Sequence, residues 1–480
     1  MLREKLRLIL RGAAVLIVSV PVTAVAVTGE RVAFESPRGL TEACVALTPV
    51  PGGMYSDADR SEEASLCAID FYSGDYALCP KTFSTSPGTL IYPLSGGPYA
   101  GRAAEFEAGH CVAGHIELKG VAASPVSFKM TMNAPDTSAT FAPAAWLYYH
   151  LSRYFRTDVY VPVSVYRSMD RKTHLERVSK RGLEASGRGG SSAMNRAGWR
   201  RLVAGDQDPD TYRPSAELYT PDGAIFGALL QPSGRRYGAE LNGTRRSGWG
   251  AGQNRDFQET APFLALRHDA PLAQAIEHGT QTAARDPELR KAMGDTPSSV
   301  QMVFWMKELT EIVILDYILS QQDRIGNIDY RNFWYWHQDG EARRLPAVDG
   351  TPPARIAAHD PVLLRRTYLN DNDAGGRVPY ANFAKTTGML EKLRHISPET
   401  YSRLLALATD FEEQGELYSW LQETFGLSDQ QFDQIVTNTR LAAETLHDSC
   451  VHGRLRFSLD PEEMLIHGST DETEIACHDN

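Results

Sequence analysis

The spacing of apolar residues divides the chain into a strand-rich first half and a helix-rich second half. Residues 126–132 alternate between apolar and polar positions and are rich in β-formers, and residues 158–166 have a similar composition. Both patterns predict strands. Residues 140–155 and 302–320 carry apolar side chains at helical spacing, and 332–336 is a short aromatic strand pattern between helices. Strands followed by helices predict an α+β fold with two lobes.

The first residues are patterned for export. Arg3, Lys5, Arg7 and Arg11 precede an apolar run over 13–23, and small residues follow at Ala24 and Ala26. This order is typical of a cleaved secretion signal over 1–26. The apolar run is shorter than the ~20 residues that a spanning helix needs. We therefore expect an exported protein, periplasmic or in the lumen of a secretory pathway, with no transmembrane segment after cleavage.

The six cysteines fit an oxidising compartment. Four lie between Cys44 and Cys111, and the other two are Cys450 and Cys477. An even number of cysteines in an exported chain favours disulfide bonds, and pairing within each group is the simplest arrangement. Residues 27–104, rich in Gly, Pro and Ser, are predicted to be an irregular extension braced by these bonds.

Composition limits the class of protein. The 480 residues carry a net charge of −11 and are 42% hydrophobic, as in ordinary globular proteins. The acidic balance argues against a nucleic-acid partner, which would require a basic surface. The basic, Gly- and Ser-rich segment 168–215 is predicted to be an exposed insertion or loop. Strands are also predicted at 114–119 and 355–360.

Lys129 is the first candidate for chemistry. It lies between Phe128 and Met130 on the predicted strand. If this face points inward, the ammonium group needs an anionic partner, because a buried unpaired charge is costly. A solvent-facing lysine is the alternative, since lysines are mostly exposed.

A second candidate follows the long apolar helix. Asp323-Arg324-Ile325-Gly326-Asn327 could orient a hydroxyl with the aspartate and bind a metal ion with the asparagine. The same residues are common in a polar turn that ends a helix. Asn332, directly before the aromatic strand, is a rival for the amide role.

The third candidate is a metal-binding carboxylate, for which two positions remain open. Asp360 closes the apolar stretch 356–358, and Asp371 lies in Asn370-Asp371-Asn372-Asp373. Carboxylate and amide oxygens suit a hard cation. An Asp-Pro turn and an Asn/Asp turn are the corresponding structural alternatives.

Together these three sites are more specific than each alone. A lysine on a strand, an Asp-Arg-x-x-Asn loop after a long helix and a strand pair ending in aspartate resemble the atypical kinase superfamily. The Golgi casein kinase type, the phosphatidylinositol 3/4-kinases and the HipA-type kinases are the most similar groups. The resemblance spans about 120–450 and implies a two-lobed, protein-kinase-like fold.

The resemblance assigns a role to each candidate. Lys129 corresponds to the phosphate-binding lysine and Asp323 to the catalytic acid. The metal ligands correspond to Asn327 or Asn332 and to Asp360, which we favour, or Asp371. The predicted helix 140–155 has no glutamate to pair with Lys129, so Glu240 and Glu259 are the nearest candidates.

The resulting hypothesis is an exported phosphotransferase that uses ATP with Mg²⁺ or Mn²⁺. It would transfer the γ-phosphate to a hydroxyl of a secreted protein, a glycan or a lipid head group. A non-catalytic, pseudokinase-like binding protein is the alternative, because no paired glutamate and no glycine-rich loop before Lys129 are evident. The domains are then a signal (1–26), an extension (27–104), an N-lobe (105–256), a C-lobe (257–450) and a tail (451–480). Asn242-Gly-Thr244 would be a glycosylation acceptor in a eukaryotic host.

Overall fold

The structure, a computed structural model, describes residues 27–111, 122–187 and 192–477. The predicted signal (1–26) and the predicted strand 114–119 lie outside these ranges. Within them, no helix is both long enough and apolar enough to cross a bilayer.

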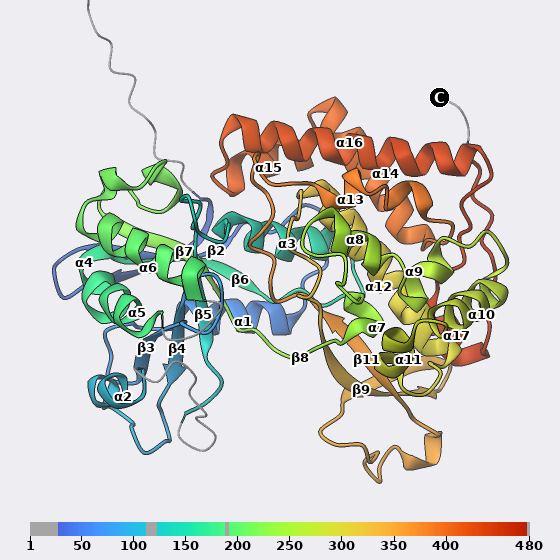
Figure 1. Cartoon of the computed structure of the whole chain (residues 1–480), viewed down its shortest axis with the longest axis horizontal. Coiled ribbons are helices and arrows are strands. Elements are labelled where there is room, and N and C mark those ends of the chain that lie inside the picture. Colours follow the sequence, from blue (N-terminus) through green and yellow to red (C-terminus); the bar gives the residue numbers. More distant parts are fainter. Residues whose placement is uncertain (1–26, 112–121, 188–191, 478–480) are drawn as a thin grey trace, which may run out of the picture.

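A seven-stranded antiparallel sheet forms the first half of the molecule (Figure 1). Its order is β1-β2-β6-β7-β5-β4-β3. The central strands β5 and β6 are buried along their whole length, whereas the edge strand β1 is largely exposed. The strands are β1 (Gly29–Glu35), β2 (Thr41–Leu47), β3 (Tyr76–Pro80), β4 (Thr89–Pro93), β5 (Val126–Met130), β6 (Ser164–Asp170) and β7 (Ala224–Leu230).

Residues 27–104 are more regular than we expected, because they supply β1 to β4 of this sheet. Strands β2, β3 and β4 are almost wholly buried, so their apolar residues form short continuous runs and do not alternate with polar ones. Such runs do not distinguish a buried strand from irregular chain. The predicted pairing of cysteines within each group is confirmed. Cys44–Cys67 joins β2 to α1 (Asp57–Cys67), Cys79–Cys111 joins β3 to the end of α2 (Ala103–His110), and Cys450–Cys477 braces the C-terminus.

The aromatic helix α3 (Ala142–Phe155) forms as predicted and is buried on nearly all sides. It packs against β6 and β7 on one side and against α12 and α14 on the other. A helix enclosed in this way needs apolar residues around its whole circumference, which explains the dense aromatic content of the segment.

The basic segment 168–215, predicted to be an exposed insertion or loop, is largely helical, so the loop alternative was wrong. It contains α4 (Arg171–His174), a π-helical turn (Leu175–Ser179), α5 (Lys180–Ala185) and α6 (Ser192–Gln207). Buried Trp199 and Leu202 anchor α6. Several of the basic residues are paired rather than solvated, as when Arg177 and Arg181 bind Glu107 of α2.

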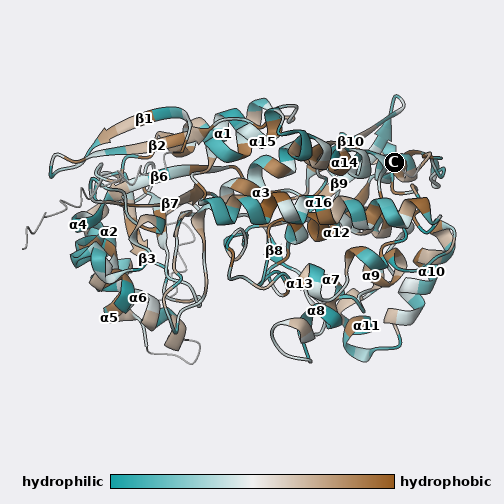
Figure 2. Cartoon of the chain, turned by 90° about the horizontal axis from the view of Figure 1, so that it is seen from above, coloured by the Kyte–Doolittle hydropathy of each residue, from teal (hydrophilic) through white to brown (hydrophobic). Residues whose placement is uncertain are grey.

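The second half is helical, as predicted (Figure 1). The apolar helix α12 runs through its centre (Figure 2) and is buried over most of its length. Pro398 stands at the first position of one helix, and Ser428 forms a capping box with Gln431 at the start of another. The helices are α7 (Ala239–Asn242), α8 (Ala251–Phe257), α9 (Ala261–Leu266), α10 (Leu272–Ala283), α11 (Pro287–Met293), α12 (Ser299–Ile318), α13 (Phe383–Thr386), α14 (Pro398–Glu413), α15 (Glu416–Thr424), α16 (Asp429–Val451) and α17 (Pro461–His467).

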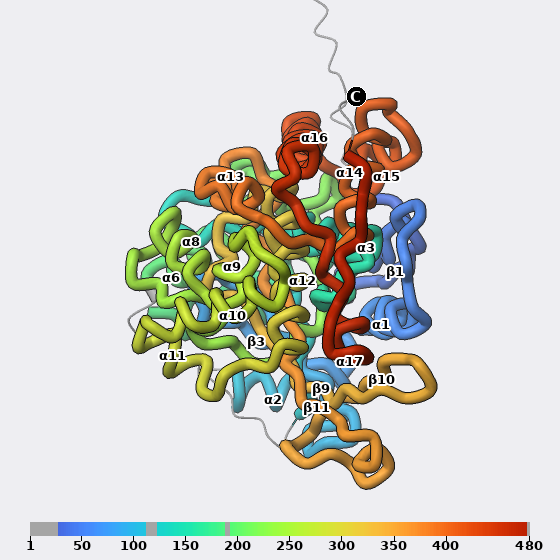
Figure 3. Tube along the Cα trace, turned by 90° about the vertical axis from the view of Figure 1, so that its right-hand side faces the viewer, coloured from blue at the N-terminus to red at the C-terminus, as the bar shows by residue number. Residues whose placement is uncertain are grey.

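A small second sheet interrupts these helices. Strand β9 (Asp329–Gln338), which contains the predicted strand 332–336, pairs with β8 (Arg235–Arg236), β10 (Glu341–Pro346) and β11 (Val362–Tyr368). The strand predicted at 355–360 is instead a 3₁₀ turn at Ala357–His359. After α16 the chain descends to α17 beside β9 and β10 (Figure 3).

The predicted α+β class is confirmed, with a strand-rich half and a helical half. The two halves also touch where the segments flanking β1 and β2 meet α15. The Thr28 amide donates to the Thr424 carbonyl at 3.2 Å, and the Trp420 indole donates to the Thr48 carbonyl at 2.9 Å.

Candidate active site

A cleft of about 570 Å³ lies where the large sheet meets the loops that flank the small one. Phe83, Leu90 and Tyr92 give part of its wall an apolar surface, whereas Lys129 and Asp371 form a charged region. A cavity of this size with a few convergent polar groups is typical of a small-molecule site.

Lys129 points into this cleft from β5. Its Nζ lies 2.7 Å from Asp371 Oδ1, 3.0 Å from the Asn370 carbonyl and 3.5 Å from Asp373 Oδ2. Burial alone would lower the pKa of Lys129, but the two carboxylates raise it above its usual value. In turn, the charge of Lys129 lowers the pKa of Asp371. The inward orientation is therefore the correct one of the two that the sequence allowed.

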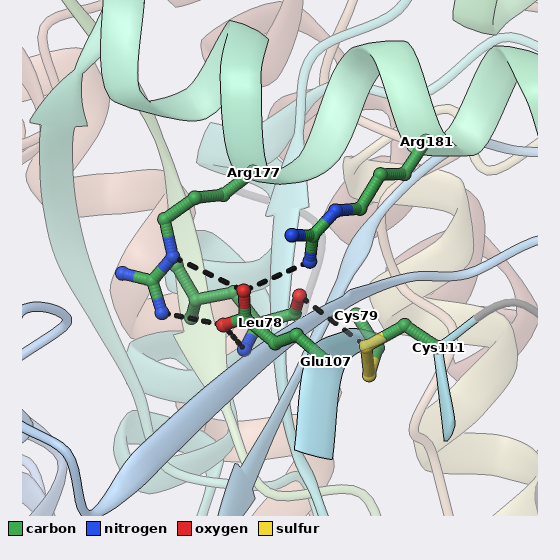
Figure 4. Close-up of a disulfide and its surroundings, with 6 residues drawn as sticks. All are labelled: Leu78, Cys79, Glu107, Cys111, Arg177 and Arg181. Atoms are coloured by element: carbon green, nitrogen blue, oxygen red, sulfur yellow. Dashed lines mark hydrogen bonds and ion pairs between the residues drawn. A yellow bond between two sulfur atoms is a disulfide. The ribbon is translucent and has the colours of Figure 1, made fainter. Parts of the chain in front are cut away.

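A second lysine, Lys81, lines the same cleft directly after β3. Burial and the neighbouring Lys129 lower the pKa of Lys81, against the attraction of Asp371. Contacts with α2 and with the residue that caps its end hold the preceding strand in place (Figure 4). Cys79 is bonded to Cys111, and Glu107 accepts from the Leu78 amide at 2.8 Å while it binds two arginines of the helical insertion. The disulfide and this ion cluster thus hold the base of the segment that carries Lys81.

Asp323 lies half-buried just beyond α12. Its Oδ1 accepts a hydrogen bond of 3.1 Å from the indole N–H of Trp249. Burial raises the pKa of Asp323 to about 6, the charges of Asp371 and Asp373 add to the rise, and the Trp249 hydrogen bond opposes it. A carboxylate with a pKa near neutral is suited to accept a proton from a hydroxyl group.

Arg324 joins the loop of Asp323 to the loop of Asp371. Its guanidinium is buried and binds Asp316 of α12 at 3.0 Å. It also donates to the Asp371 carbonyl at 3.0 Å and to Asn372 Oδ1 at 2.9 Å. Arg324, which directly follows Asp323, therefore has a structural role: it holds the two loops together.

Asn327 and Asp371 share a cationic neighbour. The Asn327 amide donates to the Asp323 carbonyl at 2.7 Å, while its Oδ1 accepts from Arg236 at 2.5 Å. Arg236 also binds Asp329 at 2.6 Å and approaches Asp371 Oδ2 at 3.6 Å. Oxygen atoms of three side chains thus converge on one guanidinium.

Asn242 is a structural support rather than an exposed glycosylation site. Its side chain is buried and donates to the carbonyls of Tyr237 and Ile328 at 3.0 and 3.1 Å. Its Oδ1 accepts from the amides of Gly326 and Ile328 at 2.9 and 3.2 Å. The residue therefore fixes the backbone of the loop that carries Asn327.

The structure brings together Lys129, Asp323, Asn327 and Asp371 but not the rival candidates. Asp360, which is exposed, lies before the start of β11, and half-buried Asp371 lies after its end. The seven residues of β11 span about 23 Å. Asn332 lies within β9, opposite Arg365, whereas Asn327 is bonded to Arg236 and to the Asp323 carbonyl. The preference for Asp360 is therefore not supported by its position.

Neither glutamate lies against Lys129. Glu240 binds Arg365 at 2.7 Å, and Glu259 binds Arg267 at 3.1 Å. The partners of Lys129 are the aspartates that follow β11, so the acid that pairs with this lysine comes from the second half of the chain.

Sequence reasoning did not identify Lys81, Arg236, Asp329, Asp373 or Trp249 as site residues. Asp373 could have been found, because it belongs to the same acidic cluster as Asp371. Arg236 lies in the two-residue strand β8 and Trp249 in a loop, and the position of both depends on long-range packing that no local pattern marks. Among the described residues, no group of three or more His, Cys, Asp or Glu is placed to hold a metal ion.

Comparison with known proteins gives only remote likenesses. No family model matches the sequence, and no curated protein matches it. Among solved structures, the crystal structure of the Golgi casein kinase with Mn/ADP bound has a TM-score of 0.42 and 11% identity, covering 82% of this chain and 77% of that chain. A second crystal structure of the Golgi casein kinase has a TM-score of 0.41 and 12% identity, covering 86% and 82%. At this level of similarity, the interpretation of the cleft rests on its own geometry.

Proposed function

We propose that the protein is a phosphotransferase that binds ATP in this cleft and transfers the γ-phosphate to a hydroxyl group. The observation that carries the proposal is the ion pair between Lys129 and Asp371, 2.7 Å long, inside a cleft that also has an apolar wall. The apolar wall suits a nucleotide base, and the charged region suits its phosphates. Phosphoryl transfer depends mainly on positioning and charge stabilisation, which such a cleft supplies.

Each charged residue has a role in this proposal. Lys129, Lys81 and Arg236 bind phosphate oxygens, because all three cations line the cleft. Asp323 orients the acceptor hydroxyl and accepts its proton, for which a pKa of about 6 is suitable. Arg324 and Asn242 act only through the backbone that they hold.

The residues present fit a divalent metal ion. Oxygen atoms of Asn327, Asp329 and Asp371 surround the Arg236 guanidinium, so a cation already occupies an oxygen-lined position. Mg²⁺ commonly takes only one or two protein carboxylates and completes its coordination with substrate phosphates and water. Asp371 and Asn327 would hold Mg²⁺ or Mn²⁺, which neutralises charge on the transferred phosphoryl group.

A thermal-shift titration tests nucleotide binding. ATP with Mg²⁺ or Mn²⁺ is expected to raise the melting temperature, because a ligand that binds only the native state stabilises it. Lys129→Ala should abolish the shift, and Lys172→Ala, an exposed lysine of α4, should leave it unchanged. The absence of any shift in the native protein would contradict the proposal.

A non-catalytic binding protein is the second candidate. The position of Arg236 favours a binding protein, because its guanidinium contacts the side-chain oxygen atoms of Asn327 and Asp371 that a metal ion would need. Release of γ-phosphate from ATP, with water as the acceptor, separates the two candidates. Nucleotide binding without measurable turnover, even at high Mn²⁺, would identify the binding protein.

We further propose that the chain is exported. The three disulfides support this, because such bonds persist in oxidising compartments. N-terminal sequencing of the protein recovered from the periplasm or the culture medium tests cleavage near residue 26. A mature chain that begins at Met1 would contradict it. The acceptor is then a secreted protein, a glycan or a lipid head group, and we expect neither nucleic acid nor a stable membrane span.

A further inference from the structure

An exposed tryptophan stands beside the candidate catalytic carboxylate. The side chain of Trp249 is 64% exposed, and its indole N–H is bonded to Asp323. The ring of Phe383 in α13 meets it at right angles, with centroids 5.6 Å apart. Large apolar side chains are often exposed singly, so the position of this one beside Asp323 is what distinguishes it.

The loop that carries Trp249 is held in a defined conformation by hydrogen bonds and by its glycine residues. Ser247 donates to the carboxylate of Asp256 through its amide at 2.8 Å and through its hydroxyl at 2.7 Å. Gly248 and Gly250, on either side of the tryptophan, have φ of +78° and +88°, which side-chain-bearing residues rarely adopt. A Cβ at Gly252 would lie 2.2 Å from the Ser247 carbonyl oxygen. The indole is thus held in place by the fold of the loop.

Arg245 adds a cation to the same region. It is exposed and has a positive φ of 55°, and its side chain has no hydrogen-bond or ion-pair partner in the part of the chain that the structure describes. Its Nη1 lies 2.5 Å from the position that a Cβ at Gly326 would take, so it reaches the catalytic loop. Backbone strain of this kind concentrates at functional sites.

These features constrain what can reach Asp323. The indole nitrogen lies 3.1 Å from the carboxylate, so an acceptor hydroxyl bonded to the same carboxylate lies next to the ring. The acceptor must therefore present an apolar surface to the indole and a hydroxyl to Asp323. A sugar ring does both as one rigid unit, because its C–H face packs on an aromatic ring while its hydroxyls point outward. A serine would instead place peptide N–H and C=O groups against the indole, where they would lose hydrogen bonds.

We propose that Trp249 is the platform on which the acceptor binds, and that the acceptor is a carbohydrate ring. The ring stacks on the exposed indole, one hydroxyl reaches Asp323, and Arg245 donates to a neighbouring hydroxyl. The assignment rests on the proposed function, since it names the acceptor class of the same site. In the transfer, the hydroxyl oxygen forms the new bond to the γ-phosphorus, ADP leaves with the electrons of the broken bond, and Asp323 takes the hydroxyl proton.

Binding to a printed array of natural oligosaccharides tests the assignment without requiring turnover. The array also carries serine-containing peptides and phosphatidylinositol. The native protein should bind a subset of oligosaccharides. Trp249→Ala should weaken this binding at least tenfold, and Trp249→Phe, which keeps an aromatic ring, should weaken it less than threefold. Trp336→Phe changes a tryptophan of β9 bonded to its own strand through Gln338 and should have no effect.

Each outcome has a defined meaning. Failure to bind any oligosaccharide, or equal binding by Trp249→Ala, overturns the assignment. Binding confined to serine peptides or to phosphatidylinositol that depends on Trp249 overturns it in favour of those acceptors. The ATP-induced thermal shift of each variant is measured in parallel. A normal shift shows that the variant folds, and loss of the shift in the native protein would reject the phosphotransferase proposal separately.

Discussion

Two clusters of charged residues differ in what surrounds them. The core cluster comprises Asp158, Lys307, Glu308, Glu311 and Arg366, where α12 meets β11. Arg366 binds Glu308 at 2.6 Å and Asp158 at 3.0 Å, and Lys307 also binds Asp158. The cleft cluster comprises Lys129, Arg236, Asp323, Asp371 and Asp373. Three of its five members are acids, and the charges of Asp371 and Asp373 add to the rise that burial causes in the pKa of Asp323.

The two clusters show how structural charge can be distinguished from functional charge. In the core cluster, burial alone would raise the pKa of Asp158, but Lys307 and Arg366 lower it, so the aspartate stays ionised and paired. In the cleft cluster, none of the described cations is bonded to the carboxylate of Asp323, and its pKa rises to about 6. A raised pKa occurs in both clusters, because burial also raises the pKa of Glu311 to about 7. What singles out Asp323 is its contact with Trp249 and its place beside the charged residues of the cleft.

The largest expected effect is on turnover in the cleft cluster. Asp323→Asn should lower kcat by about 10²- to 10⁴-fold, the usual contribution of a general base. Its free energy of unfolding should be unchanged or higher, because the substitution removes a carboxylate repelled by Asp371 and Asp373. Steady-state kinetics and urea unfolding measure the two effects.

Asp360→Asn is the matched control for that variant. Asp360 is exposed and lies beyond the other end of β11, so the substitution should leave both kcat and stability unchanged. Equal losses of activity in the two variants would contradict the assignment of Asp323.

The core cluster should respond in the opposite way. Arg366→Met should lower the free energy of unfolding by about 3–5 kcal/mol, because Glu308 and Asp158 would keep their burial and lose a partner. The double variant with Glu308→Leu should recover much of this loss. The Tm shift with ATP should persist in both folded variants. If Arg366→Met abolished nucleotide binding without loss of stability, the division between the clusters would be wrong.

Asn242→Ala should give an intermediate result, because this residue belongs to the fold but supports the cleft. Loss of its hydrogen bonds to Gly326 and Ile328 should cost about 1–3 kcal/mol. We also expect a lower kcat with little change in KM for ATP. An unchanged kcat would show that the loop of Asn327 does not need this support.

The smallest expected effect is on the pH dependence of stability. The pKa of Asp323 is higher in the folded state, about 6, than in the unfolded state, about 4. Between pH 6 and 4 the folded state therefore binds the extra proton, and this group stabilises the protein as pH falls. Relative to Asp323→Asn, the native protein should gain about 1–2 kcal/mol across this range, measured by urea unfolding in EDTA. A constant difference would contradict the raised pKa.

The sequence predicted the parts of the site that have local signals. Lys129 stood on an alternating strand, and Asp323 and Asn327 followed a long apolar helix, so each was visible from its neighbours. The choice between Asp360 and Asp371 depended on which end of β11 faces the sheet, and this is a property of strand pairing rather than of local pattern. Arg236 and Trp249 had no such signal, because only the packing of β8 and α8 brings them to the cleft. The segments 27–104 and 168–215 were misjudged for a similar reason, since Gly, Ser and Pro content concealed strands and helices that long-range contacts stabilise.

The contact between the first strand pair and α15 has a consequence for folding during synthesis. The first strand pair emerges early, yet Thr48 bonds to Trp420, 372 positions further along. A pairing this distant forms late, because the chain must lose much conformational entropy before the contact contributes. The pair of strands β1 and β2 therefore lacks its contact with the helical half until α15 has been synthesised. We expect the nascent chain to need protection from aggregation over this interval.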